Sequence, residues 1–132
     1  MMADFHAQLE KIVGAAGLLG AADLAARQGW PPYECQARLL VRPATTDAVA
    51  AVLALCHDRG QTVVPHGGRT GLVGGASSAK HDIVLSLERM NAIEGIDAVG
   101  RSMTLGAGVV LEAAQAAAAD AGLLLAADWG AR

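Results

Sequence analysis

Apolar residues recur along the chain at spacings that predict short helices and strands. An amphipathic helix is predicted near the N-terminus, ending at one of the glycines that follow, from the spacing of Phe5, Leu9, Ile12 and Val13. A second short helix is predicted over 21–28. The Trp-Pro-Pro string at 30–32 should break it, and the chain then runs as a loop to about residue 37.

The pattern becomes regular from residue 39. A buried strand is predicted at 39–41, followed by a helix that Thr45 or Thr46 can cap. The predicted apolar stripe of that helix is Val49, Val52, Leu53 and Cys56. Gly60 stands where a helix-ending glycine belongs, and 62–64 reads as the next strand. This order predicts a βαβ unit, with parallel pairing and a right-handed crossover.

Five further segments complete the prediction. A third strand is expected at 83–87, a pair of strands at 92–97 and 101–106, an Ala-rich helix at 111–121, and the start of another strand at 123–125. The predicted class is α+β. A small parallel sheet of about three strands, flanked by helices, is followed by the first strands of a second, mixed or antiparallel sheet.

Composition narrows the function classes. The chain has 132 residues, enough for one domain, and 53% are hydrophobic, although 29 of these are Ala. A net charge of −3 and few aromatic residues argue against a nucleic-acid partner. The longest stretch without an ionisable residue, 12–22, is too short to span a membrane. Without a secretory signal or a disulfide framework, a soluble cytoplasmic protein is expected.

Glycine is concentrated directly after the predicted strand 62–64. The segment 65–75 reads Pro-His-Gly-Gly-Arg-Thr-Gly-Leu-Val-Gly-Gly. Consecutive N–H groups in such a turn can converge on an anion, and glycine lets a phosphate approach the backbone. Gly68 is expected at positive φ and Arg69 as an exposed charge. His66 is interpreted as a polar strand-end residue rather than a phosphate ligand.

Spacing alone leaves several interpretations of this segment open. A P-loop requires a lysine that is missing, and a Rossmann loop should open a helix, whereas a strand follows here. The string 68–71 matches the Gly-x-x-Gly turn of a KH-type RNA clamp, although its flanks do not read as helices. A glycine-rich connection without any ligand is also open.

From about 39 to 132, the sequence resembles the FAD-binding domain of the vanillyl-alcohol oxidase, or PCMH-type, superfamily. Within it, the chain is most similar to D-2-hydroxyglutarate and D-lactate dehydrogenases and the glycolate oxidase FAD subunit. Besides the glycine segment, the resemblance is carried by Arg-Pro at 42–43, Ile-Val-Leu-Ser-Leu-Glu-Arg-Met-Asn at 83–91, Ala-Gly-Val at 107–109 and Asp-Trp-Gly-Ala-Arg at 128–132.

The resemblance implies that the backbone of the glycine segment holds the FAD pyrophosphate. It assigns the following cofactor-binding residues: Pro65, Gly67, Gly68, Arg69, Thr70, Gly71, Leu72, Gly75 and Ser86. No catalytic or metal-binding residue is assigned. Relatives with covalent flavin often have His after the Gly-Gly pair, where this chain has Arg69, so non-covalent FAD is expected.

The resemblance also implies an organisation and an activity. Residues 1–38 are expected to form an N-terminal helical segment and 39–132 the first part of the FAD-binding domain. The family's Gly-Ser-x-x-Ile-Gly-Gly-Asn segment and its substrate domain do not follow, so a fragment or truncated product is expected. The parent would be an oxidoreductase that converts a D-2-hydroxyacid of the 2-hydroxyglutarate, lactate or glycolate class to the 2-oxoacid, and this chain alone would be inactive.

Two alternatives and a partner expectation accompany this hypothesis. The chain could be a non-catalytic nucleotide- or RNA-binding module built on the glycine turn, or a remnant without a ligand. Incomplete burial of the sheets would leave a strand edge uncovered. We therefore expect a homo-oligomer, or an edge covered by the N-terminal helix.

Overall fold

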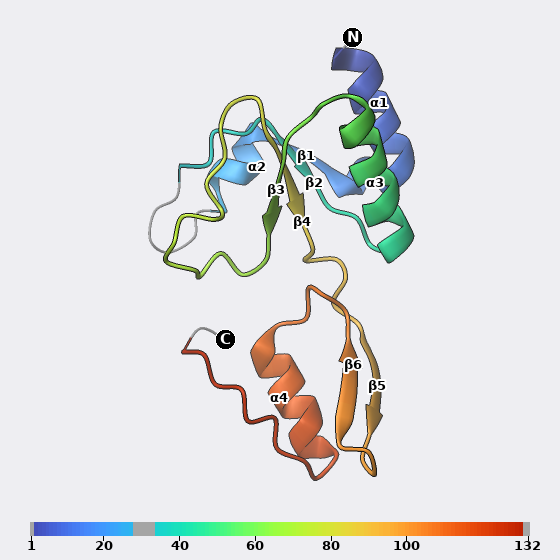
Figure 1. Ribbon diagram of the computed structural model, residues 1–132, viewed down its shortest axis with the longest axis vertical. Helices are drawn as coiled ribbons and strands as arrows, with labels where there is room; N and C mark the ends of the chain where they lie inside the picture. The colour runs from blue at the N-terminus through green and yellow to red at the C-terminus, as the bar shows by residue number, and fades with distance from the viewer. Residues whose placement is uncertain (1, 28–33, 131–132) are drawn as a thin grey trace. The chain divides into compact units, whose positions relative to one another are not determined.

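The structure is a computed structural model that describes residues 2–27 and 34–130 (Figure 1). The chain divides into two compact units, Met1–Arg89 and Met90–Arg132. No helix in the described part is long and apolar enough to cross a bilayer. The predicted break at 30–32 and the end of the predicted helix at residue 28 lie outside the described residues. The expected domain boundary after residue 38 stays a prediction.

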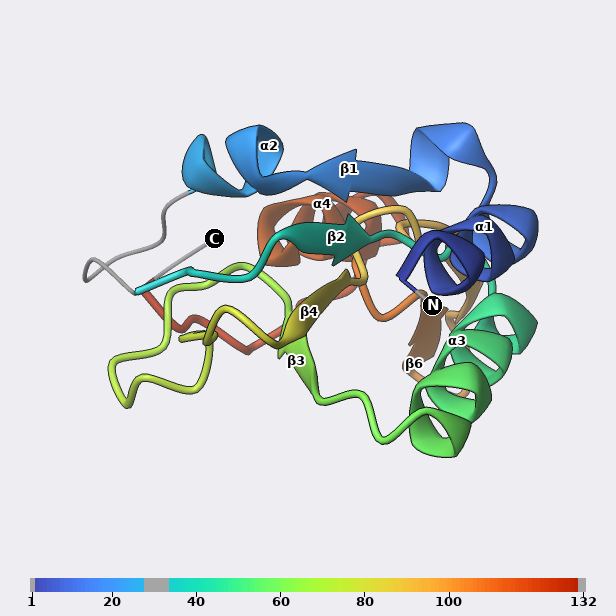
Figure 2. The same cartoon turned by 90° about the horizontal axis from the view of Figure 1, so that it is seen from above.

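The first unit contains a four-stranded sheet in the order β1-β2-β4-β3 (Figure 2). The strands are β1 (Leu18–Gly20), β2 (Leu39–Val41), β3 (Val63–His66) and β4 (Ile83–Ser86). β4 runs parallel to both β2 and β3, and β1 pairs with β2 antiparallel. The parallel sheet of three strands is therefore confirmed, and the strand β1 extends it.

The predicted direct pairing of β2 with β3 is wrong, because β4 lies between them. All four residues of β4 are buried, as a central strand requires. β3 contains Pro65, which has no N–H to donate, and such a residue suits an edge strand. β1, from the N-terminal segment, is the strand at the other end of this sheet.

Helices cover the sheet on both faces. α1 (Met2–Val13) and α3 (Thr46–Asp58) lie on one face, whereas α2 (Ala21–Ala25) lies on the other. A short 3-10 helix, η1 (Ala15–Gly17), connects α1 to β1. The predicted helices of this unit are thus confirmed, although the second ends at Ala25 and a turn follows at 26–27, where helix was still expected.

The ends of α3 agree with the predicted caps. The Thr45 hydroxyl oxygen accepts a hydrogen bond from the Ala48 N–H at 3.1 Å. Gly60 has a φ of 61°, and the N–H groups of Gly60 and Gln61 bond the carbonyls of His57 and Cys56 in a Schellman arrangement. The predicted stripe is wrong at one position, since Leu53 is 45% exposed.

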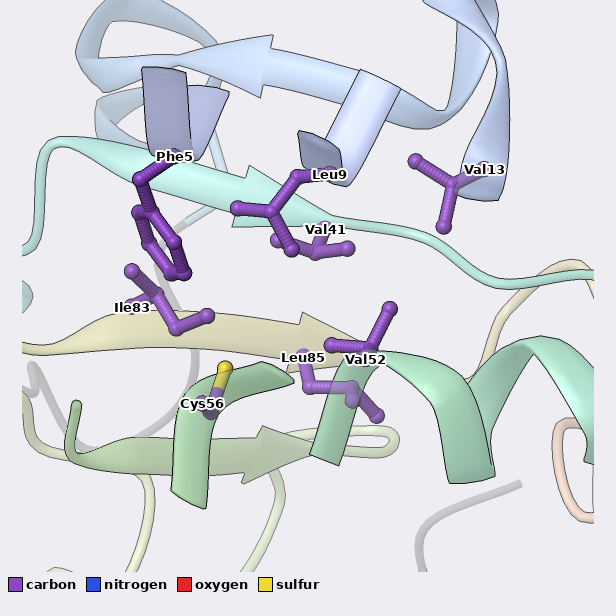
Figure 3. Close-up of a cluster of buried hydrophobic side chains, with 8 residues drawn as sticks. All are labelled: Phe5, Leu9, Val13, Val41, Val52, Cys56, Ile83 and Leu85. Carbon is purple, nitrogen blue, oxygen red and sulfur yellow. The ribbon is translucent and has the colours of Figure 1, made fainter. Parts of the chain in front are cut away.

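The larger core cluster lies between the sheet and the pair α1 and α3 (Figure 3). It consists of Phe5, Leu9, Val13, Val41, Val52, Cys56, Ile83 and Leu85. Side chains alternate across a strand, so the neighbours Leu40 and Val84 point to the other face, where they pack with Leu24 and Ala37. The sheet is therefore buried on both faces, which explains the continuous apolar runs of β2 and β4.

The second unit contains β5 (Ile93–Asp97), β6 (Ser102–Leu105) and α4 (Leu111–Asp120). β5 and β6 pair antiparallel, as predicted for this second sheet. Gly122, with a φ of 73°, ends α4 as predicted. The strand expected at 123–125 is wrong, because those residues form no regular structure.

The close packing of η1 against α1 gives a stability prediction. A Cβ at the buried Gly17 would lie 2.8 Å from Val13 Cβ and 2.8 Å from Arg89 Nη1. We expect Gly17→Ala to lower the free energy of unfolding by about 1–3 kcal/mol, because this contact cannot be made without a backbone shift. The matched control is Gly75→Ala, whose Cβ meets no atom within 4 Å and should change that free energy by less than about 0.5 kcal/mol. Urea denaturation measures both, and equal costs would contradict the prediction.

Candidate functional site

The glycine segment begins where two parallel strands end together. His66 is the last residue of β3 and is paired with Ser86, the last residue of β4. The loop 67–75, which follows β3, and the segment 87–91, which follows β4, therefore begin at the same end of the sheet. The carboxyl edge of parallel strands is where α/β proteins bind their ligands.

A hydrogen bond from His66 closes the loop. Its Nε2 lies 2.8 Å from the carbonyl oxygen of Ala76, and since a carbonyl only accepts, Nε2 carries the proton. The imidazole is buried, at 6% exposure. His66 thus acts as a structural strand-end residue, and its Nε2 hydrogen bond joins the two ends of the glycine loop.

Ser78 anchors the segment that leaves the loop. Its N–H donates to the Glu34 carbonyl and its own carbonyl accepts from Gln36 N–H, both at 2.9 Å. Its hydroxyl oxygen accepts from the Ala37 N–H at 3.3 Å. Sequence reasoning missed this buried serine, because its partners lie some forty residues away in the chain and no local pattern marks them.

The backbone of the loop has unused donors. Among the described residues, no acceptor bonds the backbone N–H groups of 67–73. A Cβ built at Gly67 would meet nothing within 4 Å, and one at Gly68 only the Thr70 side chain at 3.9 Å. The loop therefore has backbone donors without a protein acceptor and free space beside Gly67 and Gly68, and a backbone nest for phosphate oxygens requires both.

The left-handed residues of the loop are Arg69, with a φ of 57°, and Gly74, with a φ of 77°. The expected positive φ at Gly68 is wrong, since its φ lies outside the left-handed region. The expectation of an exposed Arg69 is also wrong. Its side chain is half-buried, and its guanidinium donates to the carbonyl of Arg27.

The sequence-predicted site residues fall into two groups. Those exposed along the strand end and loop are Pro65, Gly67, Gly68, Thr70, Gly71, Leu72 and Gly75. Ser86 is buried, and its hydroxyl oxygen accepts from the Glu88 N–H at 3.4 Å. The structure thus brings Ser86 to the same edge but keeps it inside the protein, and its role towards a ligand stays a prediction.

Positive charge exceeds negative charge around this edge. Arg42 follows β2, Arg69 follows β3 and Arg89 follows β4, while Arg27 follows α2. Burial raises the pKa of Glu88, but hydrogen bonds from Arg42 and Arg27 outweigh it and hold that pKa below its usual value. Only Arg27 and Arg42 pair with the Glu88 carboxylate, so these four arginines keep an excess of positive charge, which favours a diphosphate.

The sequence of residues 37–132 matches a family described as an FAD binding domain. The chain belongs to this family. The resemblance inferred from the glycine segment is therefore confirmed, and FAD is the cofactor of the domain.

Curated relatives of this FAD-binding domain are oxidoreductases by name. D-2-hydroxyglutarate dehydrogenase of Xanthomonas citri is 44% identical over 90 residues, which cover 68% of this chain and 19% of that protein. The mitochondrial D-2-hydroxyglutarate dehydrogenase of Bos taurus is 38% identical over 72% of this chain and 18% of its own length. D-lactate dehydrogenase of Anaerostipes hadrus is 40% identical over 70% and 19%. The chain thus spans about a fifth of the length of these relatives.

Solved structures confirm the PCMH-type fold. An alkyldihydroxyacetonephosphate synthase superposes with a TM-score of 0.83 at 15% identity, over 96% of this chain and 26% of that one. p-Cresol methylhydroxylase superposes with a TM-score of 0.74 at 16% identity, over 92% and 25%. At such identities the likeness concerns the fold alone.

The residues of the loop fit FAD. The unbonded N–H groups of 67–73 would hold the pyrophosphate, and the glycines leave the space that it needs. Thr70, exposed in the middle of the loop, can add a hydroxyl donor. Bound FAD supplies the hydride acceptor, and the protein supplies binding and electrostatics.

The buried imidazole gives a prediction about pH. Burial lowers the pKa of His66. The hydrogen bond to Ala76 raises this pKa, and the positive charge of Arg69 lowers it further, so that the pKa lies below its usual value. Below about pH 6.5 the folded state then binds fewer protons than the unfolded state. The contribution of His66 to the free energy of unfolding is therefore complete above about pH 6.5, and it is lost as the pH falls from there through the pKa of the folded state. We expect His66→Gln, whose amide can still donate to Ala76, to flatten this slope between about pH 5 and 7.

The control for this measurement is His6→Gln, at an exposed position on α1. The midpoint of urea denaturation, followed as a function of pH, distinguishes the variants. An unchanged slope in His66→Gln, or the same flattening in His6→Gln, would contradict the assignment.

Proposed function

We propose that this chain is the FAD-binding portion of a flavoenzyme that oxidises a D-2-hydroxyacid to the 2-oxoacid. The observation that supports FAD binding is the loop 67–75 at the carboxyl end of two parallel strands, where the N–H groups of 67–73 have no acceptor among the described residues and the glycines leave free space. The substrate class is supported by the names of the relatives that share 38–44% of the matched residues. Because the chain spans about a fifth of their length, the activity is proposed for a whole enzyme of that size.

We further propose that FAD is bound without a covalent bond. Flavins are attached through nucleophilic side chains such as His or Cys, and the loop 67–75 contains neither. Arg69 stands after the Gly-Gly pair, and its guanidinium is bonded to the carbonyl of Arg27. FAD would then be held by backbone donors and released on denaturation.

The RNA-clamp alternative is not favoured. Its Gly-x-x-Gly turn joins two helices, whereas the turn 68–71 follows the strand β3. The side chain that would contact the RNA backbone, Arg69, is bonded to the protein instead.

Two expectations about the cellular form stay predictions. The first is a homo-oligomer that forms through an uncovered strand edge. The second is a cytoplasmic location, although the Bos taurus relative is described as mitochondrial.

The glycine loop gives the sharpest test of FAD binding. Because Gly68 has no strained φ and a Cβ there meets only the Thr70 side chain, at 3.9 Å, Gly68→Val should leave the midpoint of urea denaturation unchanged. Its methyl groups would occupy the space of the phosphates, so we expect the affinity for FAD to fall by about a hundredfold or more. Flavin fluorescence titration measures this affinity. The control is Gly95→Val, which is remote in sequence and where a Cβ meets nothing within 4 Å. Tight FAD binding by Gly68→Val would contradict the proposal.

The substrate class requires a whole enzyme. We suggest replacing the matching 90 residues of the Xanthomonas citri D-2-hydroxyglutarate dehydrogenase with the aligned residues of this chain. The chimaera should retain FAD and be reduced by D-2-hydroxyglutarate or D-lactate but not by the L-enantiomers, as seen by bleaching of the flavin absorbance. Gly68→Val in the chimaera should abolish both FAD content and reduction. A folded chimaera that contains no FAD would contradict the proposed function.

A further inference from the structure

Arg69 occupies a backbone conformation that disfavours an arginine. In the described part of the chain, only Arg69 and Arg101 are non-glycine residues with positive φ, at 57° and 52°. In this region the Cβ of an L-residue crowds the following carbonyl, and glycine avoids the cost. Three of the four nearest residues, Gly67, Gly68 and Gly71, are glycines, whereas position 69 carries a long side chain at a φ of 57°. A contact of this side chain can offset the backbone cost.

That contact is made to the N-terminal segment. The Arg69 guanidinium donates to the carbonyl oxygen of Arg27, two residues after α2 ends. The Arg27 guanidinium in turn pairs with one carboxylate oxygen of Glu88, which follows β4. The glycine loop is thus linked through Arg27 to the central strand of the sheet.

A third arginine, Arg42, also pairs with Glu88 and completes this hydrogen-bonded network. Arg42 Nη1 lies 2.8 Å from the other carboxylate oxygen of Glu88, and Arg42 Nη2 donates to the carbonyl of Ala16 in η1. The side chains of Arg27, Arg42 and Glu88 are 28%, 19% and 38% exposed. Such half-buried, charge-assisted hydrogen bonds are screened less than surface pairs, so the network can hold its members in place.

We propose that Arg69 is a positioning residue for the cofactor, held in place by the hydrogen-bonded network of Arg27, Glu88 and Arg42, which we call the relay. The inference rests on the proposed binding of the FAD pyrophosphate by the loop. The guanidinium of Arg69 orients the loop from behind, while the backbone donors of 67–73 remain open to the phosphates. Arg27, which precedes the part of the chain matched by the family, thereby helps to position the cofactor site.

A positioning role for the Arg69 side chain and backbone strain at position 69 predict opposite effects of the substitution Arg69→Gly. If only the left-handed φ mattered, Arg69→Gly would relieve strain and preserve the site. If the side chain positions the loop, Arg69→Gly should lower the ¹⁵N order parameters of Gly68, Thr70 and Gly71 from about 0.85 to below about 0.6. It should also weaken FAD binding about tenfold, as expected for the loss of a charged hydrogen bond.

Two matched variants separate positioning from general stability. Arg101→Gly relieves the same backbone strain in the second unit and should leave the order parameters of the loop unchanged. Arg69→Lys keeps a cation that can reach the same carbonyl and should restore most of the order. Unchanged loop order parameters in Arg69→Gly would overturn the proposal.

The relay is tested by Glu88→Gln, with Glu10→Gln, an exposed residue of α1, as its control. We expect Glu88→Gln to loosen the same loop amides, and the double variant Arg69→Gly/Glu88→Gln to loosen them no further, since both cut one network. Additive effects, or no effect of Glu88→Gln, would overturn the relay.

The order parameters are measured on the full chain without FAD, so they decide the proposal even if FAD does not bind. Absence of FAD binding by the unaltered chain would count only against the proposed function.

Discussion

The parallel pairing of β3 with β4 is the interaction on which the site depends. It brings His66 and Ser86 opposite each other at the end of the sheet. The glycine loop and the turn that carries Glu88 therefore start from neighbouring points. His66 then fixes the far end of the loop through Ala76. A shift of this register by one residue would reverse the faces of Val84 and Leu85, which pack in different core clusters, so the core protects the geometry of the site.

Local signals predicted most elements of the fold. The cap at Thr45 and the glycines 60 and 122 act on neighbouring backbone groups, and the structure confirms all three. The position of β4 between β2 and β3 was not predicted, because strand order depends on contacts distant in sequence. β1 was missed for a different reason, since Leu18–Gly20 has only three residues, too few to show an alternating strand pattern.

The candidate site was also predicted only in the parts that depend on residues close in sequence. The glycine string and the resemblance located the loop. Both depend on consecutive residues, because glycines that are close in sequence allow a phosphate to approach the backbone. The conformation of Arg69 and its bond to Arg27 were not predicted, and neither was the anchoring of Ser78. These features depend on partners 41 and 42 residues away in the chain, which neither spacing nor composition reveals.

The central claim is that the backbone N–H groups of the loop bind the pyrophosphate of FAD. The most direct measurement is a ¹H–¹⁵N correlation spectrum of the chain during titration with FAD. We expect saturable downfield shifts of the amides of Gly67, Gly68 and Thr70, with the amides of α3 unchanged. Saturable binding of FAD that leaves the loop amides unshifted and moves signals elsewhere would contradict it.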